Sequence, residues 1–228
     1  MRATICFGGS IVVPDLPDIE CLREIVEALR ELRKKRHEIL VVVGGGKTSR
    51  LYIDIAQKLG APDSHCDAVG IEATRLNARL LISALGGLAE PNPAVTFEAA
   101  IRTSLQGKIP VMGGTTPGQT TDAVAAMLAS SSKSEMLVFF TDVDGVYTAD
   151  PKLNPDAKKF QTMTAQQLMG LISNVKMKPG IKLIIDPVAA KIIERSRIRT
   201  IVIGGHEIKR LPEILEGGNH SGTTILPK

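Results

Sequence analysis

A run of three glycines followed by two basic residues is the part of this sequence best suited to chemistry. The apolar stretch 41–43 ends at Gly44, Gly45 and Gly46, and Lys47 and Arg50 follow within four residues. Glycines allow a sharp turn and a close approach of the backbone to a ligand, and the first turn of a helix offers unpaired N–H groups. The pattern therefore predicts a cradle for an anion, with phosphate as the natural occupant.

Two common phosphate-binding loops do not match this spacing. A Walker A loop would have a glycine at position 41, where this sequence has Val41, and a Rossmann fingerprint would have a third glycine at position 49, where it has Ser49. On this stretch alone, a strand-to-helix turn without a ligand remains an alternative.

Other loops rich in glycine, hydroxyl or carboxylate groups also follow predicted strands. Residues 8–10 end the first strand, the loop 113–122 follows a strand at 109–112, and the turn 142–145 follows a strand at 136–140. In an open parallel sheet, ligands bind at the carboxyl ends of the strands. We therefore expect these loops to lie at one edge and to form a single site.

The elements that must position these loops alternate along the chain. Short β-branched runs predict strands, and apolar residues at helical spacing predict helices between them. The predicted strands are 2–7, 39–43, 109–112, 136–140, 200–203 and 223–226, and the predicted helices are 19–32, 51–59, 68–84, 96–105, 123–129, 165–172, 187–196 and 207–215. This order predicts an α/β fold, a three-layer α/β/α sandwich with a mainly parallel central sheet, in one domain spanning 1–228.

Two details of this pattern are specific enough to test. In the helix 68–84, the residues that we expect to face inward are Val69, Leu76, Leu80 and Leu81, and the expected polar features are Asp67, Thr74, Arg75 and Asn77. The turn 142–145 predicts a hairpin whose return arm lies near 158–163.

The composition argues against several classes of protein. Of the 228 residues 43% are hydrophobic, and no apolar run approaches the roughly 20 residues that span a bilayer. The first residues predict a strand and not a signal peptide, so we expect a cytoplasmic protein that does not bind membranes. Cys6, Cys21 and Cys66 are odd in number and widely spaced, which argues against disulfides and zinc. A net charge of +4 with 3% aromatic residues does not support nucleic-acid binding.

Four motifs together carry a resemblance to a known family. They are Gly44-Gly45-Gly46-x-x-x-Arg50, Asp67-x-x-Gly70-x-x-x-Thr74-Arg75-x-Asn77-Ala78, Gly113-Gly114-Thr115-x-Pro117-Gly118-x-Thr120-Thr121-Asp122 and Asp144-Gly145-Val146-Tyr147-x-x-Asp150-Pro151. In this order they resemble the archaeal-type uridylate (UMP) kinases of the amino acid kinase family. The resemblance runs from Gly8 to near Gly222.

The resemblance implies a carbamate kinase-like fold and transfer of the γ-phosphoryl group of Mg·ATP to UMP, giving UDP. It implies Mg²⁺ carried with ATP and no metal site of the protein's own. It further implies that the N-terminal part binds UMP, that the part from about residue 130 binds ATP, and that the chain forms a homo-oligomer, a homohexamer. The alternatives are another small-substrate kinase of this family and a non-catalytic nucleotide-binding homologue.

The resemblance also implies roles for individual residues. The expected UMP contacts are Gly45, Asp67, Thr115, Thr116, Pro117, Gly118, Gln119, Thr120 and Thr121. The expected ATP contacts are Gly9, Ser10, Gly46, Arg50, Thr141, Asp142, Tyr147 and Asp150. The expected catalytic residues are Arg50, Lys47, Asp186 and Lys182.

Two departures from the family pattern bear on these roles. Many relatives carry a lysine before the first glycine loop, where this chain has Cys6 and Phe7, so we expect Lys47, Lys178 or Lys182 to supply the charge, with Asp186 orienting the lysines. Asp142 stands where relatives usually have Asn, and its charge is tolerable if it contacts Mg²⁺ or a lysine.

Simpler structural roles also remain open for several of these residues. Asp67 could cap its helix without touching a ligand, and Thr120 and Thr121 could cap theirs. Tyr147 could be a core residue of the hairpin.

Overall fold

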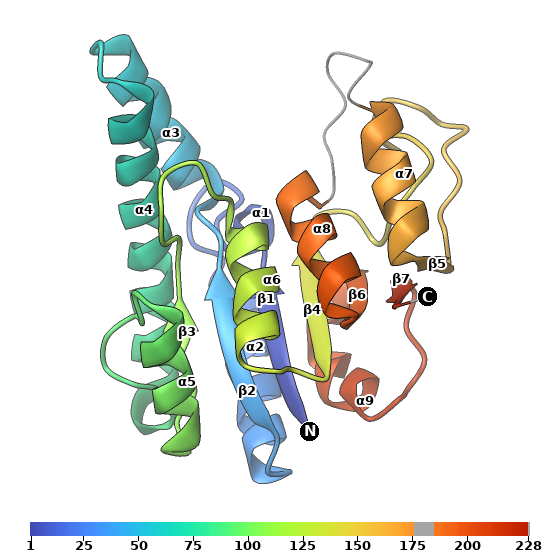
Figure 1. The fold of residues 1–228 in the computed structure, drawn as a ribbon. Coiled ribbons are helices and arrows are strands. Elements are labelled where there is room, and N and C mark those ends of the chain that lie inside the picture. Colours follow the sequence, from blue (N-terminus) through green and yellow to red (C-terminus); the bar gives the residue numbers. More distant parts are fainter. Residues whose placement is uncertain (176–184, 228) are drawn as a thin grey trace.

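A seven-stranded sheet runs through the middle of the protein (Figure 1). The computed structural model describes residues 1–175 and 185–227, and Lys182 lies outside this part. Within it the strand order is β3-β2-β1-β4-β6-β7-β5, and every pair is parallel except β6 with β7. The strands are β1 (Arg2–Phe7), β2 (Glu38–Val43), β3 (Val111–Met112), β4 (Met136–Thr141), β5 (Thr162–Thr164), β6 (Arg199–Gly204) and β7 (Thr223–Leu226).

Helices cover both faces of this sheet. The α-helices are α1 (Gly9–Val12), α2 (Ile19–Lys34), α3 (Gly46–Lys58), α4 (Asp63–Leu85), α5 (Phe97–Leu105), α6 (Thr121–Ser131), α7 (Ala165–Val175), α8 (Pro187–Ser196) and α9 (Leu211–Leu215). Two short 3₁₀ helices are η1 (Gly86–Leu88) and η2 (Gly205–Arg210). One apolar core joins the sheet to α2, α4 and α9, and the other joins it to α5, α6, α7 and α8. The predicted three-layer fold is confirmed.

The central strands show why their sequences are continuously apolar. Ile5 and Phe7 of β1 belong to one core, whereas Cys6 between them belongs to the other. Successive side chains of a strand point to opposite faces, so a strand covered on both faces needs an apolar residue at every position. The run 39–43 of β2 divides between the two cores in the same way.

Helix α4 differs from the expectation for its inward face. Leu76 and Leu80 are 61% and 39% exposed, whereas Thr74 and Asn77 are 7% and 4% exposed. The prediction is therefore wrong for Leu76 and Leu80, whereas Leu81, which is 1% exposed, faces inward as expected. The physical reason is that the face of α4 that carries Thr74 and Asn77 lies against glycine loops, whose backbone groups require polar partners.

The predicted hairpin forms only near its turn. Tyr147 pairs with Lys159 in an antiparallel bridge, and the Phe160 N–H donates to the Val146 carbonyl at 2.9 Å. After Phe160 the chain leaves the hairpin, because residues 162–164 form β5, which pairs in parallel with β7.

Prolines account for two further differences in the elements. Strand β3 is shorter than predicted, with Ile109 in an isolated bridge and Pro110, which has no N–H to donate, before the strand. The predicted helix 207–215 is divided into η2 and α9, and Pro212 lies in the first turn of α9. In the described ranges 1–175 and 185–227, no helix is both long enough and apolar enough to cross a bilayer.

Candidate active site

The two glycine turns after β1 and β2 are in direct backbone contact. A Cβ atom on Gly9 would lie 2.0 Å from the Gly46 nitrogen, and one on Gly44 would lie 2.4 Å from the Gly9 nitrogen. Gly46 also has a φ of +62°, which favours glycine. These residues therefore have to be glycine for the first turns of α1 and α3 to meet.

Two buried side chains of α4 fix the glycine loops in place. The Asn77 amide donates to the Gly44 carbonyl at 2.9 Å and to the Gly45 carbonyl at 3.1 Å. The Thr74 hydroxyl accepts from the Gly114 N–H at 2.6 Å. Both side chains are buried, and these bonds hold the glycine turn 44–46 and the loop 113–122 against α4. Their motif positions are visible in the sequence, but this bracing role was not predicted.

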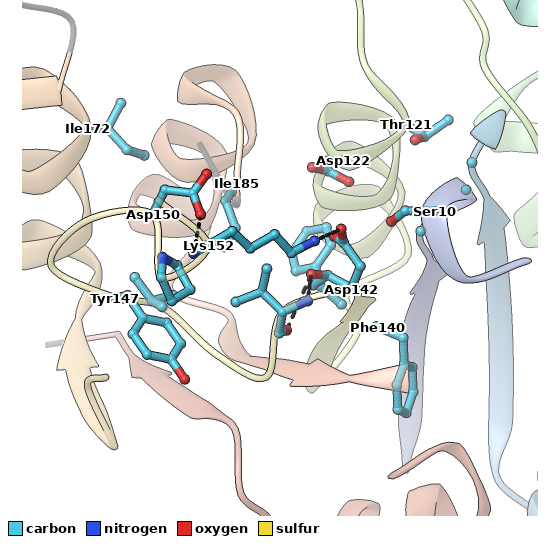
Figure 2. Close-up of a pocket in the computed structure, with 18 of the residues that line it drawn as sticks. Ser10, Thr121, Asp122, Phe140, Asp142, Tyr147, Asp150, Lys152, Ile172 and Ile185 are labelled. Atoms are coloured by element: carbon cyan, nitrogen blue, oxygen red, sulfur yellow. Dashed lines mark hydrogen bonds and ion pairs between the residues drawn. The ribbon is translucent and has the colours of Figure 1, made fainter. Parts of the chain in front are cut away.

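A cavity of about 280 Å³, the main cavity, opens at the carboxyl ends of β1, β2 and β4 (Figure 2). Its polar part contains the two glycine turns, Ser10, Arg50 and Thr121. Its apolar part lies between the hairpin and α7. That apolar lining is Val146, Leu168, Leu171, Ile172 and Ile185. The main cavity can therefore hold a ligand with a charged end and a flat apolar end.

A second cavity, of about 250 Å³, lies on the other side of the start of α3. This side cavity is lined by α3, α4 and the loop before α6, and it shares Gly45, Gly46, Arg50 and Thr121 with the main cavity. A ligand in each cavity would therefore place its charged end at the same four residues.

Most residues expected to contact UMP gather at the side cavity. Its lining includes Gly45, Asp67, Thr116, Gln119, Thr120 and Thr121. Thr115, Pro117 and Gly118 belong to the same loop but are not part of the lining. Asp67 accepts a 2.7 Å hydrogen bond from the Gly118 N–H, so its carboxylate holds the loop as well as facing the cavity. Asp67 lies inside α4 and does not cap it, since α4 begins at Asp63.

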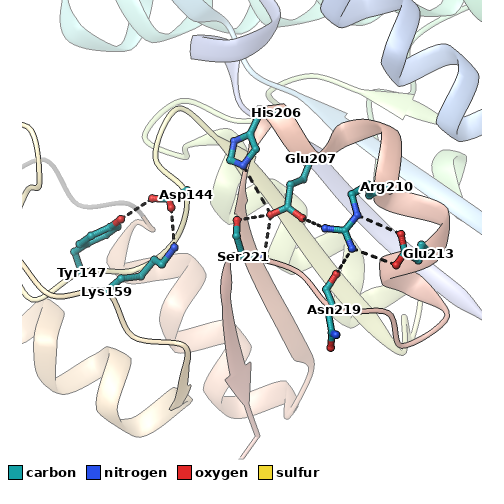
Figure 3. A network of polar contacts seen from close by, with 9 residues as sticks. All are labelled: Asp144, Tyr147, Lys159, His206, Glu207, Arg210, Glu213, Asn219 and Ser221. Carbon is teal, nitrogen blue, oxygen red and sulfur yellow. Dashed lines mark hydrogen bonds and ion pairs between the residues drawn. The ribbon is translucent and has the colours of Figure 1, made fainter.

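All the residues expected to contact ATP line the main cavity. They are Gly9, Ser10, Gly46, Arg50, Thr141, Asp142, Tyr147 and Asp150. The Tyr147 hydroxyl donates to Asp144 at 2.6 Å, and Lys159 pairs with the other carboxylate oxygen of Asp144 at 2.7 Å (Figure 3).

The contacts of Asp144 with Tyr147 and Lys159 lower the pKa of the carboxyl group and raise the pKa of the tyrosine hydroxyl. The hydrogen bond to Asp144 raises the pKa of Tyr147 to about 12. Burial acts to raise the pKa of Asp144, but its bonds with Lys159 and Tyr147 lower it overall. The tyrosine is therefore a neutral hydrogen-bond donor at neutral pH and shapes one side of the cavity.

The four expected catalytic residues have different surroundings. Arg50 lies where the two cavities meet. Lys47 is exposed, lines neither cavity and pairs with Asp15. Asp186 caps α8 by accepting from the Val188 N–H at 2.7 Å, and it also accepts from the Thr120 hydroxyl. Asp186 thus ties the starts of α8 and α6 together. Lys182, and Lys178 as the other lysine considered for the missing charge, fall outside the described residues.

Sequence reasoning did not assign roles to two charged residues of the main cavity. Asp122, at the start of α6, and Lys152, in the hairpin loop, both belong to its lining. Asp122 was visible in the third motif, whereas no motif included Lys152. Near Asp122, burial raises the pKa of the Cys6 thiol, and the neighbouring carboxylate raises it further. Cys6 therefore stays a neutral thiol and cannot supply the positive charge expected before the first glycine loop.

The side chains of the main cavity suit oxygen ligation but do not form a metal site by themselves. Asp122 and Asp142 provide the carboxylate oxygens that Mg²⁺ prefers. Among residues 1–175 and 185–227, however, no group of three or more His, Cys, Asp or Glu side chains could hold a metal ion.

Comparisons with known proteins agree with this geometry. The chain is 47% identical over 215 residues to a uridylate kinase of Methanococcoides burtonii, covering 94% of this chain and 91% of the relative. It is 45% identical over 227 residues to one of Pyrococcus abyssi, covering both chains completely. A crystal structure of uridylate kinase from Archaeoglobus fulgidus superposes with a TM-score of 0.87 at 41% identity, covering 99% of this chain and 100% of that one.

The resemblance deduced from the four motifs is therefore confirmed. The model of the amino acid kinase family matches residues 1–204, which is most of the sequence. This chain belongs to the amino acid kinase family.

Proposed function

We propose that this protein is a uridylate kinase that transfers the γ-phosphoryl group of ATP to UMP, giving UDP and ADP. The observation that carries the proposal is that the main and side cavities meet at Gly45, Gly46, Arg50 and Thr121. The names of the similar proteins support the choice of acceptor. ATP occupies the main cavity and UMP the side cavity in this proposal.

The residues at the junction suit a reaction that needs alignment more than acid–base chemistry. The acceptor is already an anionic phosphate oxygen, so no general base is required, and catalysis depends on bringing two polyanions together and neutralising their charge. Backbone N–H groups at the start of α3 and the guanidinium of Arg50 can bind oxygens of both phosphates. Arg50 therefore stabilises the charge that is shared between donor and acceptor during transfer.

We also propose that Mg²⁺ arrives with ATP. When bound, the ion neutralises part of the phosphate charge, and the carboxylates of Asp122 and Asp142 face the cavity in which it would lie. The apolar part of the cavity, including Leu168 and Ile172, suits the adenine ring. Across the junction, Asp67 and Gln119 offer polar groups to the nucleoside of UMP.

The proposed function includes an oligomeric state, a cellular location and a metabolic role. We propose a cytoplasmic homohexamer that acts in pyrimidine nucleotide synthesis. Exposed apolar side chains on α3, namely Leu51, Tyr52 and Ile55, support self-association because a surface of this kind favours contact with another protein. Size-exclusion chromatography with light scattering tests the hexamer.

One assay tests the activity. The purified protein is incubated with Mg·ATP and a panel of nucleoside monophosphates, carbamate, amino acids and isoprenoid phosphates, and the release of ADP is followed. We expect turnover with UMP. Turnover only with a non-nucleotide acceptor would assign a different kinase of the family, and ATP binding without turnover would assign a non-catalytic homologue.

A further inference from the structure

The side chain of Lys152 crosses the rim of the main cavity (Figure 2). It starts from the hairpin loop, and its ammonium pairs with Asp142 at the end of β4, with Nζ and Oδ2 2.6 Å apart. Both residues line the main cavity and also an outer groove next to it, which extends to α2 and Gly205. This ion pair therefore lies between the two spaces.

The backbone of Lys152 is held firmly, although its side chain is accessible. Asp150 accepts from the Lys152 N–H at 2.9 Å through its carboxylate, and its carbonyl accepts from the Asn154 N–H at 2.9 Å. The side chain of Lys152 is 59% exposed and that of Asp142 is 27% exposed. An ion pair this accessible to water contributes little net stability, so Lys152 can exchange its partner without disturbing the loop.

The charges of the main cavity indicate which partner would take the place of Asp142. The described lining contains three carboxylates, Asp122, Asp142 and Asp150, against two cations, Arg50 and Lys152. A triphosphate entering such a space needs cationic partners, because its own charge repels the carboxylates. Arg50 serves the end of the cavity that meets the side cavity, whereas Lys152 lies on the hairpin side.

We propose that Lys152 is an ATP-binding residue, which exchanges Asp142 for the phosphate chain of ATP when the nucleotide enters the main cavity. The inference rests on the proposed function only in placing ATP there. Asp142 holds the lysine at the rim before ATP binds. The same pairing offsets the negative charge of Asp142 beside the cavity.

The test replaces Lys152 with glutamine, which keeps most of the length of the side chain and removes its charge. For Lys152→Gln we expect the Kd for Mg·ATP, measured by calorimetry, to rise about tenfold, as for the loss of one charge-assisted hydrogen bond. The KM for UMP and the thermal denaturation midpoint should not change. Lys152→Arg should recover most of the ATP affinity.

Lys158→Gln is the matched control, since Lys158 is an exposed lysine of the same hairpin that does not line the main cavity. Its ATP affinity should equal that of the wild type. An unchanged Kd in Lys152→Gln would overturn the proposal, and so would an equal loss in both variants, which would indicate a general effect of net charge.

These outcomes are distinct from failure of the proposed function. If the wild type phosphorylates UMP and Lys152→Gln binds ATP normally, only the role of Lys152 is refuted. If the wild type binds ATP but does not phosphorylate UMP, the kinase proposal is refuted, and a weaker ATP affinity in Lys152→Gln still supports the role of the lysine.

Discussion

Arg50 is the charged residue that belongs to both cavities. It lies one turn inside α3, after the glycine turn, so its guanidinium is near the start of the helix, where backbone N–H groups are unpaired. In the proposed reaction, a cation at this position would stabilise the negative charge of the phosphoryl group as it passes from ATP to UMP. Its contribution should therefore be larger in the transition state than in either ground-state complex.

We expect Arg50→Ala to lower kcat by about 100-fold or more, as for the loss of a transition-state charge contact. The KM values for ATP and UMP should change much less. Steady-state kinetics with both substrates measures the effect. The control is Lys58→Ala, which removes a cation from the far end of the same helix, where Lys58 pairs with Asp54 on the surface. A kcat close to that of the wild type in Arg50→Ala would argue against the assignment.

At the scale of elements, the site depends on how closely the starts of α1 and α3 approach each other. Gly44 and Gly9 leave no room for a side chain, because an added Cβ on either would overlap backbone atoms of the facing turn. The Asn77 amide then fixes the carbonyls on the other side of the second turn. The two turns therefore have to move apart if either glycine gains a side chain.

Gly44→Ala should thus weaken ATP binding by about tenfold or more and lower the thermal denaturation midpoint by several degrees, since overpacking typically costs about 1–3 kcal/mol. Calorimetry and thermal denaturation measure the two effects. Gly87→Ala is the control, because a Cβ on Gly87 would meet nothing within 4 Å. If Gly44→Ala behaved like Gly87→Ala, the close contact of the turns would not matter to the site.

At the scale of the whole molecule, the buried carboxylate of Glu207 binds the segment that leads into β7 (Figure 3). Glu207 is 4% exposed, and it accepts from the Ser221 N–H at 2.9 Å and from Arg210 at 2.8 Å. Two residues further on, the Thr223 hydroxyl accepts from the Val146 N–H at 2.8 Å. Glu207 therefore holds the segment that supports one wall of the main cavity.

The protonation of Glu207 gives this link a pH dependence. Burial acts to raise the pKa of Glu207, but hydrogen bonds from Ser221 and the positive charges of Arg210 and His206 lower it overall. A lowered pKa in the folded state stabilises the protein fully above the pKa of the unfolded state, about 4.3. That stabilisation is lost as the pH falls through the lower pKa of the folded state.

We expect Glu207→Gln to lower the free energy of unfolding at neutral pH by about 1–3 kcal/mol, because the substitution removes the charge and replaces one of the two acceptor oxygens of the buried network by an amide donor. The difference in the free energy of unfolding between wild type and variant should become smaller below about pH 4, as Glu207 becomes protonated in the wild type. Urea denaturation at several pH values measures it. Glu213→Gln is the control, since Glu213 also contacts Arg210 but its side chain is 58% exposed. If this difference in the free energy of unfolding did not depend on pH, Glu207 would not be ionised in the folded protein.

Much of the fold and part of the site could be predicted from local sequence patterns. Apolar runs such as 39–43 are continuous because the strands are buried on both faces, so they identified a parallel sheet with helices on both sides. The glycine turns predicted a ligand site at one edge of the sheet, since loops at the carboxyl ends of parallel strands meet there, and the structure places these loops around shared cavities. The motif around Gly44 and Arg50 therefore predicted a phosphate site, and the four motifs together indicated the family.

The sequence by itself thus determined the alternation of elements and the family, and it predicted the edge of the sheet at which phosphate would bind. The tertiary structure alone decided that Thr74 and Asn77 of α4 are buried, that Lys152 meets Asp142, and that the two cavities meet at Arg50. The physical reason is that periodicity reports which face of a helix is apolar but not what lies opposite it. A polar side chain facing backbone carbonyls, or a lysine facing an aspartate ten residues away, depends on contacts that only the folded chain creates.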